Sequence, residues 1–223
     1  MPEGQVTPHP YYPRNLFLPG YRPNRVPLTE LLGLFFGLVA IALISTWILA
    51  GRFNKRGADR VVICWFVVCG FIHSVLEGYF AANHETIIGG GSYLAEMWKE
   101  YGRGDSRYLT SDSFTVCMET ITAVLDGPLC FAAAIAHLTG SRHRYPLQLI
   151  VSLCQLYGDT LYMCIEWKED FVHGEYGHPL TFWFYFVFLN LFWIFVPLIL
   201  IIQAYVALSA SPSGDLHKTK KKK

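Results

Sequence analysis

Residues 69–80, CGFIHSVLEGYF, place a histidine and a glutamate inside an otherwise apolar segment. His73 and Glu77 are four residues apart, so in a helix they share a face and can hydrogen-bond. A charged side chain at the centre of a membrane-spanning helix costs roughly 2.5 to 3.5 kcal/mol, which makes such residues candidates for a functional site. The spacing alone also allows a structural pair that joins two helices.

Residues 114–130, FTVCMETITAVLDGPLC, carry a second polar face. Thr122 lies about one helical turn from Glu119, and Asp126 lies about two turns from it. A threonine in a helix bonds to its own backbone more often than to a ligand. Asp126 precedes Gly-Pro, where a bent helix would free backbone groups or admit water. The sequence assigns no chemical role to this aspartate.

The last apolar segment adds Asn190 and Trp193, which are three residues apart. By default, an asparagine in lipid holds helices together and a tryptophan fills volume. Combined with the histidine and the two glutamates they indicate more, because carboxylates, an amide oxygen and an indole face all stabilise positive charge. The set predicts a pocket for a hydrophobic cation, or for a reaction that passes through one.

The chemistry open to these side chains is proton transfer. The sequence has no HExxH zinc motif, no Gly-x-Ser-x-Gly elbow and no dinucleotide-binding glycine fingerprint, so hydrolysis and hydride transfer lack their parts. The six cysteines form no CxxC pair and lack the histidine spacing of a zinc site. We therefore expect no metal and no cofactor, and protonation chemistry or cation binding on a lipid-soluble molecule.

The composition is typical of a membrane protein, with 52% hydrophobic and 16% charged residues, against about 25% charged in soluble domains. A formal net charge of +1 gives no reason to expect nucleic-acid binding. We predict an all-α membrane protein, a single bundle of five transmembrane helices that encloses an intramembrane ligand pocket. A span needs about 20 helical residues, and the predicted spans are residues 28–50, 61–82, 113–138, 146–166 and 180–208.

The fourth span has the weakest signal, because it contains Gln155, Asp159 and Glu166. Five spans put eleven Lys/Arg residues on one side and seven on the other, and the richer side should be cytosolic. Four spans would put both ends of the chain on the same side of the membrane, and the Lys/Arg distribution would then conflict with the position of the basic tail. The predicted organisation is a luminal N-terminal segment at 1–27, a transmembrane domain at 28–208 and a cytosolic basic tail at 209–223.

The tail, HKTKKKK, has Lys220 and Lys221 at the fourth and third positions from its end. This pattern resembles the dilysine retrieval signal of endoplasmic reticulum membrane proteins. A basic tail attracted to lipid is the other interpretation, and a cytosolic position favours the signal.

The loop between the second and third spans contains SYLAEMWKEYGRGDSRYL. Its apolar residues follow helical spacing, with Trp98 on one side and Glu96 and Lys99 on the other, which predicts a short helix lying in the membrane interface. The loop also spells GRGDS, an integrin-recognition string. Such strings arise by chance, and we do not expect adhesion.

Five longer motifs carry a family resemblance: CWFVVCGFIHSVLEGYF, MWKEYGRGDSRYL, FTVCMETITA, QLYGDTLY and HGEYGHPLTFWFYFVFLNLFW. They resemble the emopamil-binding-protein (EXPERA domain) family, and the likeness extends from HPYYP near the N-terminus through the fifth span. The wider family includes a sigma-2-receptor-like branch and an isomerase-like paralogue. The KEY and GDSRY strings and METITA are most similar to the branch of 3β-hydroxysteroid Δ8-Δ7 isomerases.

The resemblance implies an enzyme that moves a sterol double bond from C8=C9 to C7=C8, converting zymosterol-type into lathosterol-type sterols without a redox cofactor. A proton adds at C9, a cation forms at C8 and a proton leaves C7. It also implies binding of cationic amphiphilic amines, because a protonated amine imitates the charge of that cation. The alternative within the family is a receptor that binds sterols or amines without chemistry.

The resemblance also places six residues in the site: His73, Glu77, Glu119, Thr122, Asn190 and Trp193. We predict that His73 with Glu77 donates the proton, that Glu119, oriented by Thr122 and Asn190, accepts the proton from C7, and that Trp193 stabilises the cation. The two carboxylates can also exchange roles. Tyr108 and Met118 are predicted pocket-wall residues, with simple packing as the alternative. Asp126 is not matched to the family pattern, and its role stays open.

The same resemblance predicts the setting of the protein. It implies the endoplasmic reticulum membrane, extending to the nuclear envelope, with membrane lipid as surroundings and a sterol as substrate. A homodimer and an association with a sterol reductase are both compatible with it. A proton-coupled transporter would also use buried histidine and glutamate, but the chain lacks the repeat-related broken helices common in transporters.

Overall fold

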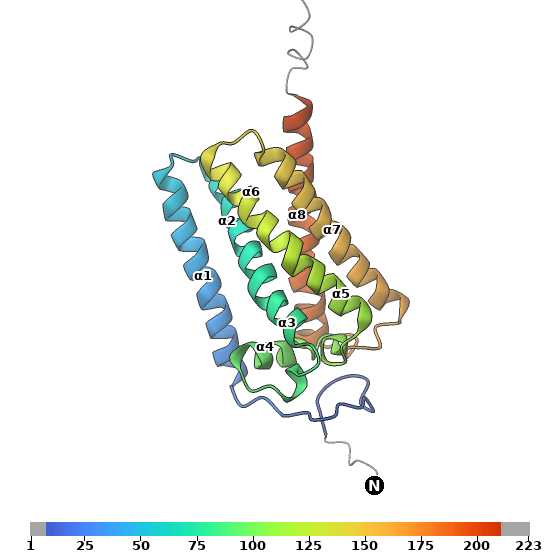
Figure 1. Cartoon of the computed structure of the whole chain (residues 1–223). Coiled ribbons are helices and arrows are strands. Elements are labelled where there is room, and N and C mark those ends of the chain that lie inside the picture. Colours follow the sequence, from blue (N-terminus) through green and yellow to red (C-terminus); the bar gives the residue numbers. More distant parts are fainter. Residues whose placement is uncertain (1–7, 211–223) are drawn as a thin grey trace, which may run out of the picture.

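The computed structural model describes residues 8–210 of the 223 residues. Within that range the protein is helical and has no strands, which confirms the predicted all-α class. Five long helical stretches run side by side (Figure 1). They are α1 (Leu28–Arg52); α2 (Gly57–Phe71) with η1 (Ile72–Glu77) and α3 (Gly78–Asn83); α5 (Ser113–Ile121) with η4 (Thr122–Asp126) and α6 (Gly127–Thr139); α7 (Arg144–Lys168); and η5 (Pro179–Phe188) with α8 (Leu189–Ser209).

Three shorter elements cover one end of this bundle. They are η2 (Ile87–Gly89), α4 (Tyr93–Tyr101) and η3 (Ser106–Leu109), all in the connection between α3 and α5. Ser92 and Asp112 cap the helices that follow them, because each side chain accepts a hydrogen bond from a first-turn amide. The predicted short helix is therefore confirmed as α4.

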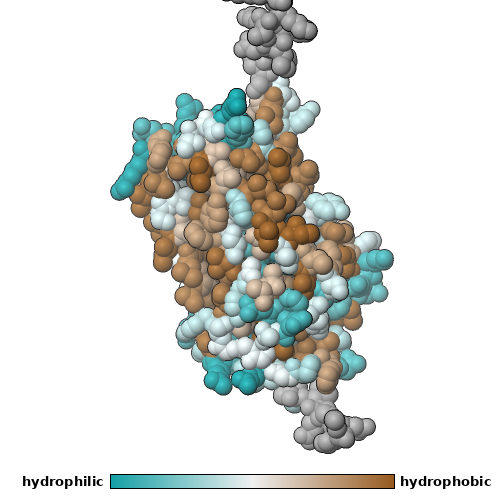
Figure 2. Space-filling model, viewed as in Figure 1, coloured by the Kyte–Doolittle hydropathy of each residue, from teal (hydrophilic) through white to brown (hydrophobic). Residues whose placement is uncertain are grey.

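Four of the five predicted spans are confirmed as helices long and apolar enough to cross a membrane. Apolar side chains are exposed along the outside of the bundle, and Figure 2 shows them as a brown surface with teal side chains gathered mainly towards the two ends. A soluble domain would bury such a surface. The chain is a membrane protein. The four stretches are Leu28–Arg52, Gly57–Asn83, Ser113–Thr139 and Pro179–Ser209.

Helix α7 does not meet the same hydropathy criterion, because one of its faces is polar. Its polar residues recur every three or four positions, so they form one stripe along the helix. The members of this stripe are Gln148, Ser152, Gln155, Asp159, Tyr162 and Glu166. Five of them are buried and Asp159 is partly buried, while Leu153 and Tyr157 on the opposite side are exposed. Helix α7 therefore points its polar face into the bundle.

Three of the long stretches contain a π-helical segment. These are η1, η4 and η5, and each interrupts or precedes an α-helix within the bundle. Such segments are rare and frequently occur at functional sites, because the wider turn redirects side chains and loosens the backbone hydrogen-bond ladder. His73 and Glu77 lie in η1, and Thr122 and Asp126 lie in η4.

Segments η1 and η4 approach each other closely at Gly127. A Cβ atom at this position would lie 2.2 Å from Oγ of Ser74 and 3.1 Å from its backbone nitrogen. Only glycine fits without moving the neighbouring helix. This contact brings the polar residues of the two segments to the same level of the bundle.

The charged face of α4 is buried against the protein, and its position in the membrane interface stays a prediction. The N-terminal segment covers this face: Glu96 accepts hydrogen bonds from the backbone amides of Arg25 and Val26 at 3.0 and 2.8 Å. The ammonium group of Lys99 donates to the carbonyl oxygens of Arg22 and Gly90. Both charged side chains therefore form hydrogen bonds within the protein, which hold the segment before α1 against α4.

The GRGDS string is also part of the internal structure. Asp105 and Ser106 are buried, and Arg107 binds Asp105 with Nη2 at 2.6 Å. The same guanidinium lies 3.2 Å from Glu166 at the end of α7. A buried aspartate cannot be presented to an adhesion receptor, so the integrin interpretation is excluded. The predicted dilysine signal, Lys220 and Lys221, lies outside the described residues.

His173 completes this ionic cluster from the loop at 169–178, since its Nδ1 hydrogen-bonds to Glu166. The hydrogen bond that His173 donates to Glu166 raises the pKa of this histidine above its usual 6.5. A raised pKa means that the protonated ring stabilises the folded state, fully below about pH 6.5 and less as the pH rises through the folded value.

We therefore expect the melting temperature to fall as the pH is raised from about 6.5 towards 8.5, and His173→Gln to lessen this fall, since the variant has no ring proton to lose. Thermal unfolding in detergent at a series of pH values measures it. His143→Gln, at an exposed histidine near the start of α7, is the control and should retain the wild-type slope. If the melting temperature of His173→Gln fell with pH as steeply as that of wild type, the assignment of the pH dependence to His173 would be wrong.

Candidate active site

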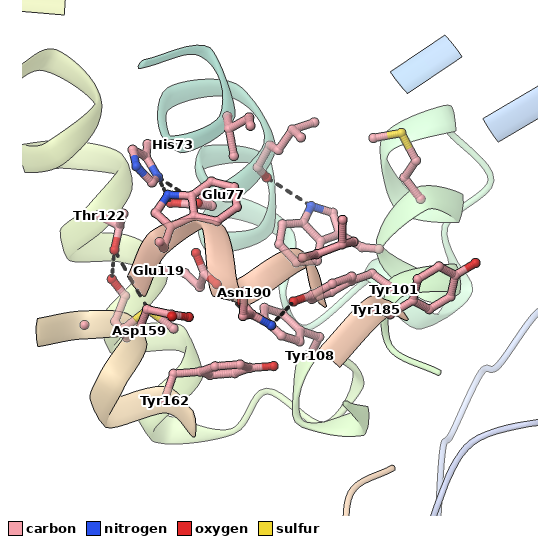
Figure 3. Close-up of a pocket in the computed structure, with 18 of the residues that line it drawn as sticks. His73, Glu77, Tyr101, Tyr108, Glu119, Thr122, Asp159, Tyr162, Tyr185 and Asn190 are labelled. Carbon is pink, nitrogen blue, oxygen red and sulfur yellow. Dashed lines mark hydrogen bonds and ion pairs between the residues drawn. The ribbon is translucent and has the colours of Figure 1, made fainter. Parts of the chain in front are cut away.

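A cavity inside the bundle brings together residues from nine elements, and Figure 3 shows part of its wall. It is lined by α1, η1, α4, α5, η4, α7 and α8 and by Tyr108 of η3 and Tyr185 of η5. Every predicted site residue contributes to its wall. These are His73, Glu77, Tyr108, Met118, Glu119, Thr122, Asn190 and Trp193.

The histidine and glutamate of η1 form a close pair. Nδ1 of His73 lies 2.7 and 2.8 Å from the two carboxylate oxygens of Glu77. On its other side, Nε2 of His73 lies 3.0 Å from the amide nitrogen of Gln155 on α7. With the amide as donor, Nε2 accepts, so the ring carries its proton on Nδ1 and donates it to Glu77. A second proton on the ring would require the Gln155 amide to turn over.

Glu119 is buried on the neighbouring helix and accepts a hydrogen bond from the hydroxyl of Tyr108 at 2.5 Å. Its carboxyl group lines the same cavity as that of Glu77, so η1 and α5 each contribute one carboxyl group to the wall.

The predicted orientation of Glu119 by Thr122 and Asn190 is wrong in its partners. Thr122 donates to the carbonyl oxygen of Met118 at 2.8 Å, the usual bond of a helical threonine. Asn190 donates to the carbonyl oxygen of Phe186 at 2.6 Å and to the hydroxyl of Tyr101 at 3.2 Å. Tyr108, predicted only as a wall residue, is the side chain that orients Glu119.

Aromatic rings form a large part of the cavity wall. The ring of Trp193 meets that of His73 edge-on, with centroids 6.2 Å apart. Tyr101, Tyr108 and Tyr162 lie along the opposite part of the cavity, where Figure 3 shows their rings near Glu119 and Asn190. Faces of such rings attract cations.

The charge of the wall is one-sided. Five carboxyl side chains and one histidine line the cavity, and no lysine or arginine is among the described lining residues. The carboxyl residues are Glu77, Glu100, Glu119, Asp126 and Asp159. An apolar cavity with this lining favours a positive charge over a negative one.

Residues of α7 were missed as site residues by the sequence reasoning, which treated Gln155 and Asp159 only as a weakness of the fourth span. Both line the cavity, together with Tyr162. The signal that could have found them is the polar stripe of α7, since polar residues at helical spacing within an apolar helix mark a face turned away from lipid. Asp126 lines the same cavity, and its side chain caps no backbone amide of the helix that follows.

A second cluster has donor atoms that could hold a metal ion. Atoms of Asp105, Glu166 and His173 lie within 4.8 Å of one another. The guanidinium of Arg107 already binds both carboxylates, at 2.6 and 3.2 Å, and supplies the positive charge that a cation would bring. The arrangement fits an internal ionic cluster better than a metal site.

Comparisons with known proteins identify the family of the chain. A family model described as EXPERA (EXPanded EBP superfamily) matches residues 93–204. The chain is 45% identical over 216 residues to the 3-beta-hydroxysteroid-Delta(8),Delta(7)-isomerase of Mus musculus, which covers 96% of this chain and 94% of the mouse protein. It is 44% identical over 208 residues to that of Rattus norvegicus, with 92% and 90% covered. The probable isomerase of Oryza sativa subsp. japonica is 35% identical over 220 residues, with 97% and 100% covered. This chain therefore belongs to the EXPERA family.

Proposed function

We propose that this protein is a sterol Δ8-Δ7 isomerase of the endoplasmic reticulum membrane, which moves the C8=C9 double bond of a 3β-hydroxysterol to C7=C8. Relatives that carry this name cover more than nine-tenths of the chain. The observation that carries the proposal is the cavity in which a histidine and two glutamates meet in an apolar bundle, beside aromatic rings. The reaction moves a double bond within one molecule, so it needs acids, bases and a cation-stabilising wall, and no oxidant.

The first step is protonation of the double bond. His73 and Glu77 form the donor side, and the proton they deliver adds to C9, which leaves a tertiary cation at C8. Within this side His73 positions the donor, because its Nδ1–H donates to Glu77 and its Nε2 accepts from Gln155. The carboxyl group of Glu77 then carries the proton that is delivered to C9.

The second step is loss of a proton from C7. Glu119 is the acceptor, and the hydroxyl of Tyr108 fixes the position of its carboxylate. The electrons of the C7–H bond then form the C7=C8 double bond, and the cation is discharged. Glu119 and Glu77 line the same cavity, so the accepted proton can return to the donor side within it.

Between these steps, the cation at C8 is stabilised by the charge and the rings of the wall. Trp193 faces the cation with its indole, and the carboxylates lower its energy through space. The same features favour a protonated amine with an apolar body, so the site also binds cationic amphiphilic amines. A receptor of sterols or amines without chemistry would use the same cavity, and it is the alternative function.

Helix α7 is the fifth transmembrane span in this proposal. Its 25 residues are long enough, and its polar stripe faces the bundle while apolar side chains face outward. An odd number of spans fits the two ends of the described chain, which lie at opposite ends of the bundle (Figure 1). The Lys/Arg balance of eleven to seven then sets the C-terminal side in the cytosol.

The domain boundaries at residues 28 and 208 stay predictions from the apolar segments, and the homodimer and the association with a sterol reductase stay predictions from the resemblance. The proposed chemistry needs only the cavity of one chain.

For the topology, we expect a glycosylation acceptor sequence fused before the N-terminus to be modified in endoplasmic reticulum microsomes, and the same sequence fused after the C-terminus to remain unmodified. Five spans place the two ends on opposite sides of the membrane, and only the luminal side carries the transferase. A shift in gel mobility, removed by glycosidase, measures it. Equal modification of both ends would rule out an odd number of spans.

For the activity, we expect purified protein to convert a Δ8-sterol into its Δ7 isomer without any added cofactor. With enzyme in excess and equilibrated in heavy water, one turnover should place one deuterium at C9, because the donor proton has exchanged with solvent. Mass spectrometry and deuterium NMR of the product measure it. A product without deuterium, or a requirement for a nicotinamide, would contradict the proposed mechanism. Sterol binding with no conversion would favour the receptor.

For the acceptor, we expect Glu119→Gln to lower kcat/KM by about 10²- to 10⁴-fold, the usual contribution of a general base. The amide keeps the volume and still accepts the hydrogen bond from Tyr108, so the fold should be preserved. Glu85→Gln, at an exposed glutamate after α3, is the matched control and should behave as wild type. Turnover near the wild-type rate in Glu119→Gln would show that another group takes the proton.

A further inference from the structure

Four buried atoms of the cavity wall that can accept a hydrogen bond have no partner within the described chain: Oδ1 of Asp126, Oε1 of Gln155, Oδ2 of Asp159 and the hydroxyl oxygen of Tyr162. Of these residues, Asp126 and Gln155 lie at the same level of the bundle. Both side chains are 4% exposed and line the cavity. Leaving such atoms unpaired is costly, so each of them favours a partner from outside the chain, such as water or a ligand.

These two acceptors lie in the same part of the cavity. The amide of Gln155 contacts the ring of His73 at 3.0 Å and the thiol of Cys130 at 3.7 Å. Cys130 lies about one turn after Asp126 on the same helical stretch, so η4 and α7 meet at this level. Asp126 and Gln155 therefore form one subsite, which we call the acceptor subsite.

The opposite part of the cavity has a different character. The side chains from α1 and α4 are mostly apolar there, among them Leu31, Phe35 and Met97. The one carboxylate on this side, Glu100, is already bonded by Arg103 at 2.9 Å and by the hydroxyl of Tyr185 at 3.0 Å. A ligand with one polar end and one apolar end thus has a single favourable direction in the cavity.

We propose that the acceptor subsite binds the 3β-hydroxyl group of the sterol, with the O–H donating to Oδ1 of Asp126. The proposal rests on the proposed function, because it takes the sterol as the occupant. A 3β-hydroxysterol has one hydroxyl at one end and an aliphatic side chain at the other. The hydroxyl satisfies an unpaired acceptor, whereas the aliphatic chain would leave both acceptors unpaired and would fit the wall of α1 and α4.

The position of Asp126 along the bundle fits this direction. Asp126 follows Glu119 by seven residues, so the two carboxyl groups are separated by about 10 Å along the helix. In the sterol, the hydroxyl is on the A ring and the reacting carbons are on the adjacent B ring. With the hydroxyl at Asp126, the reacting carbons lie between His73 and Glu119. Asp126 thus acts as a specificity residue that sets the register of the substrate.

The test compares two substrates, a 3β-hydroxy Δ8-sterol and the same sterol without the oxygen at C3. We expect wild type to prefer the hydroxysterol in kcat/KM by about ten- to a hundredfold, the range for a hydrogen bond to a charged group. Asp126→Leu should lose most of this preference through a lower value for the hydroxysterol alone. Asp126→Asn keeps a neutral acceptor and should fall between the two.

Asp159→Asn is the matched control, because Asp159 is another unpaired carboxyl of the cavity wall, near Glu119. It should change both substrates by the same factor and keep the preference. Asp126→Leu removes an unpaired buried carboxyl group, so its melting temperature should not be lower than that of wild type. If this variant does not fold, Asp126→Asn provides the measurement instead. A wild-type preference retained in both Asp126 variants, or equal losses on both sterols, would overturn the proposal.

Failure of the proposed function is distinguishable from failure of the subsite. If wild type isomerises neither sterol, the function is wrong, and the same comparison is then made as equilibrium binding of the two sterols to protein in detergent. Loss of the hydroxyl preference in Asp126→Leu would still support the subsite, and its retention would overturn it.

Discussion

The structure depends on one constraint, which is that an ionisable side chain within an apolar bundle must find its partner inside the protein. Water is absent from the lipid-facing surface, so each buried carboxyl, amide or ring nitrogen has to be paired or used. His73 meets this need with Glu77 on one side and Gln155 on the other. Glu119 meets it with Tyr108. These pairings join η1, η3, α5 and α7, so they fix the bundle and build the cavity at the same time.

Much of the fold was predictable from the sequence because four spans have a high mean hydropathy, which detects such helices directly. Helix α7 was harder, since its polar stripe reduces its mean hydropathy even though its outer face is apolar. Its length and its place between two other spans still predicted residues 146–166, which is within two residues of α7 at each end. The π-helical segments were not predictable, because no local residue pattern distinguishes a wider turn from an α-helical one.

The membership of the site was predictable to a greater extent than its contacts. His73 and Glu77 share a helix, so their spacing alone sets them side by side. The partners of Glu119 come from other elements, and nothing in the local sequence says that the tyrosine of η3 reaches it while Asn190 turns to Tyr101. The same limit applied to α4, where the helix was predicted but the burial of Glu96 and Lys99 depends on a segment some 70 residues earlier.

The packing of α1 has a consequence for how the protein works in its membrane. This helix buries only three of its side chains, Leu31, Thr46 and Ala50, although Leu31, Leu32 and Phe35 close one wall of the cavity. Most of its surface therefore rests against acyl chains, and the surrounding lipid shares in holding that wall in place. Bilayer thickness and sterol content then act on the cavity directly, and the concentration that governs its occupancy is the mole fraction of ligand in the membrane.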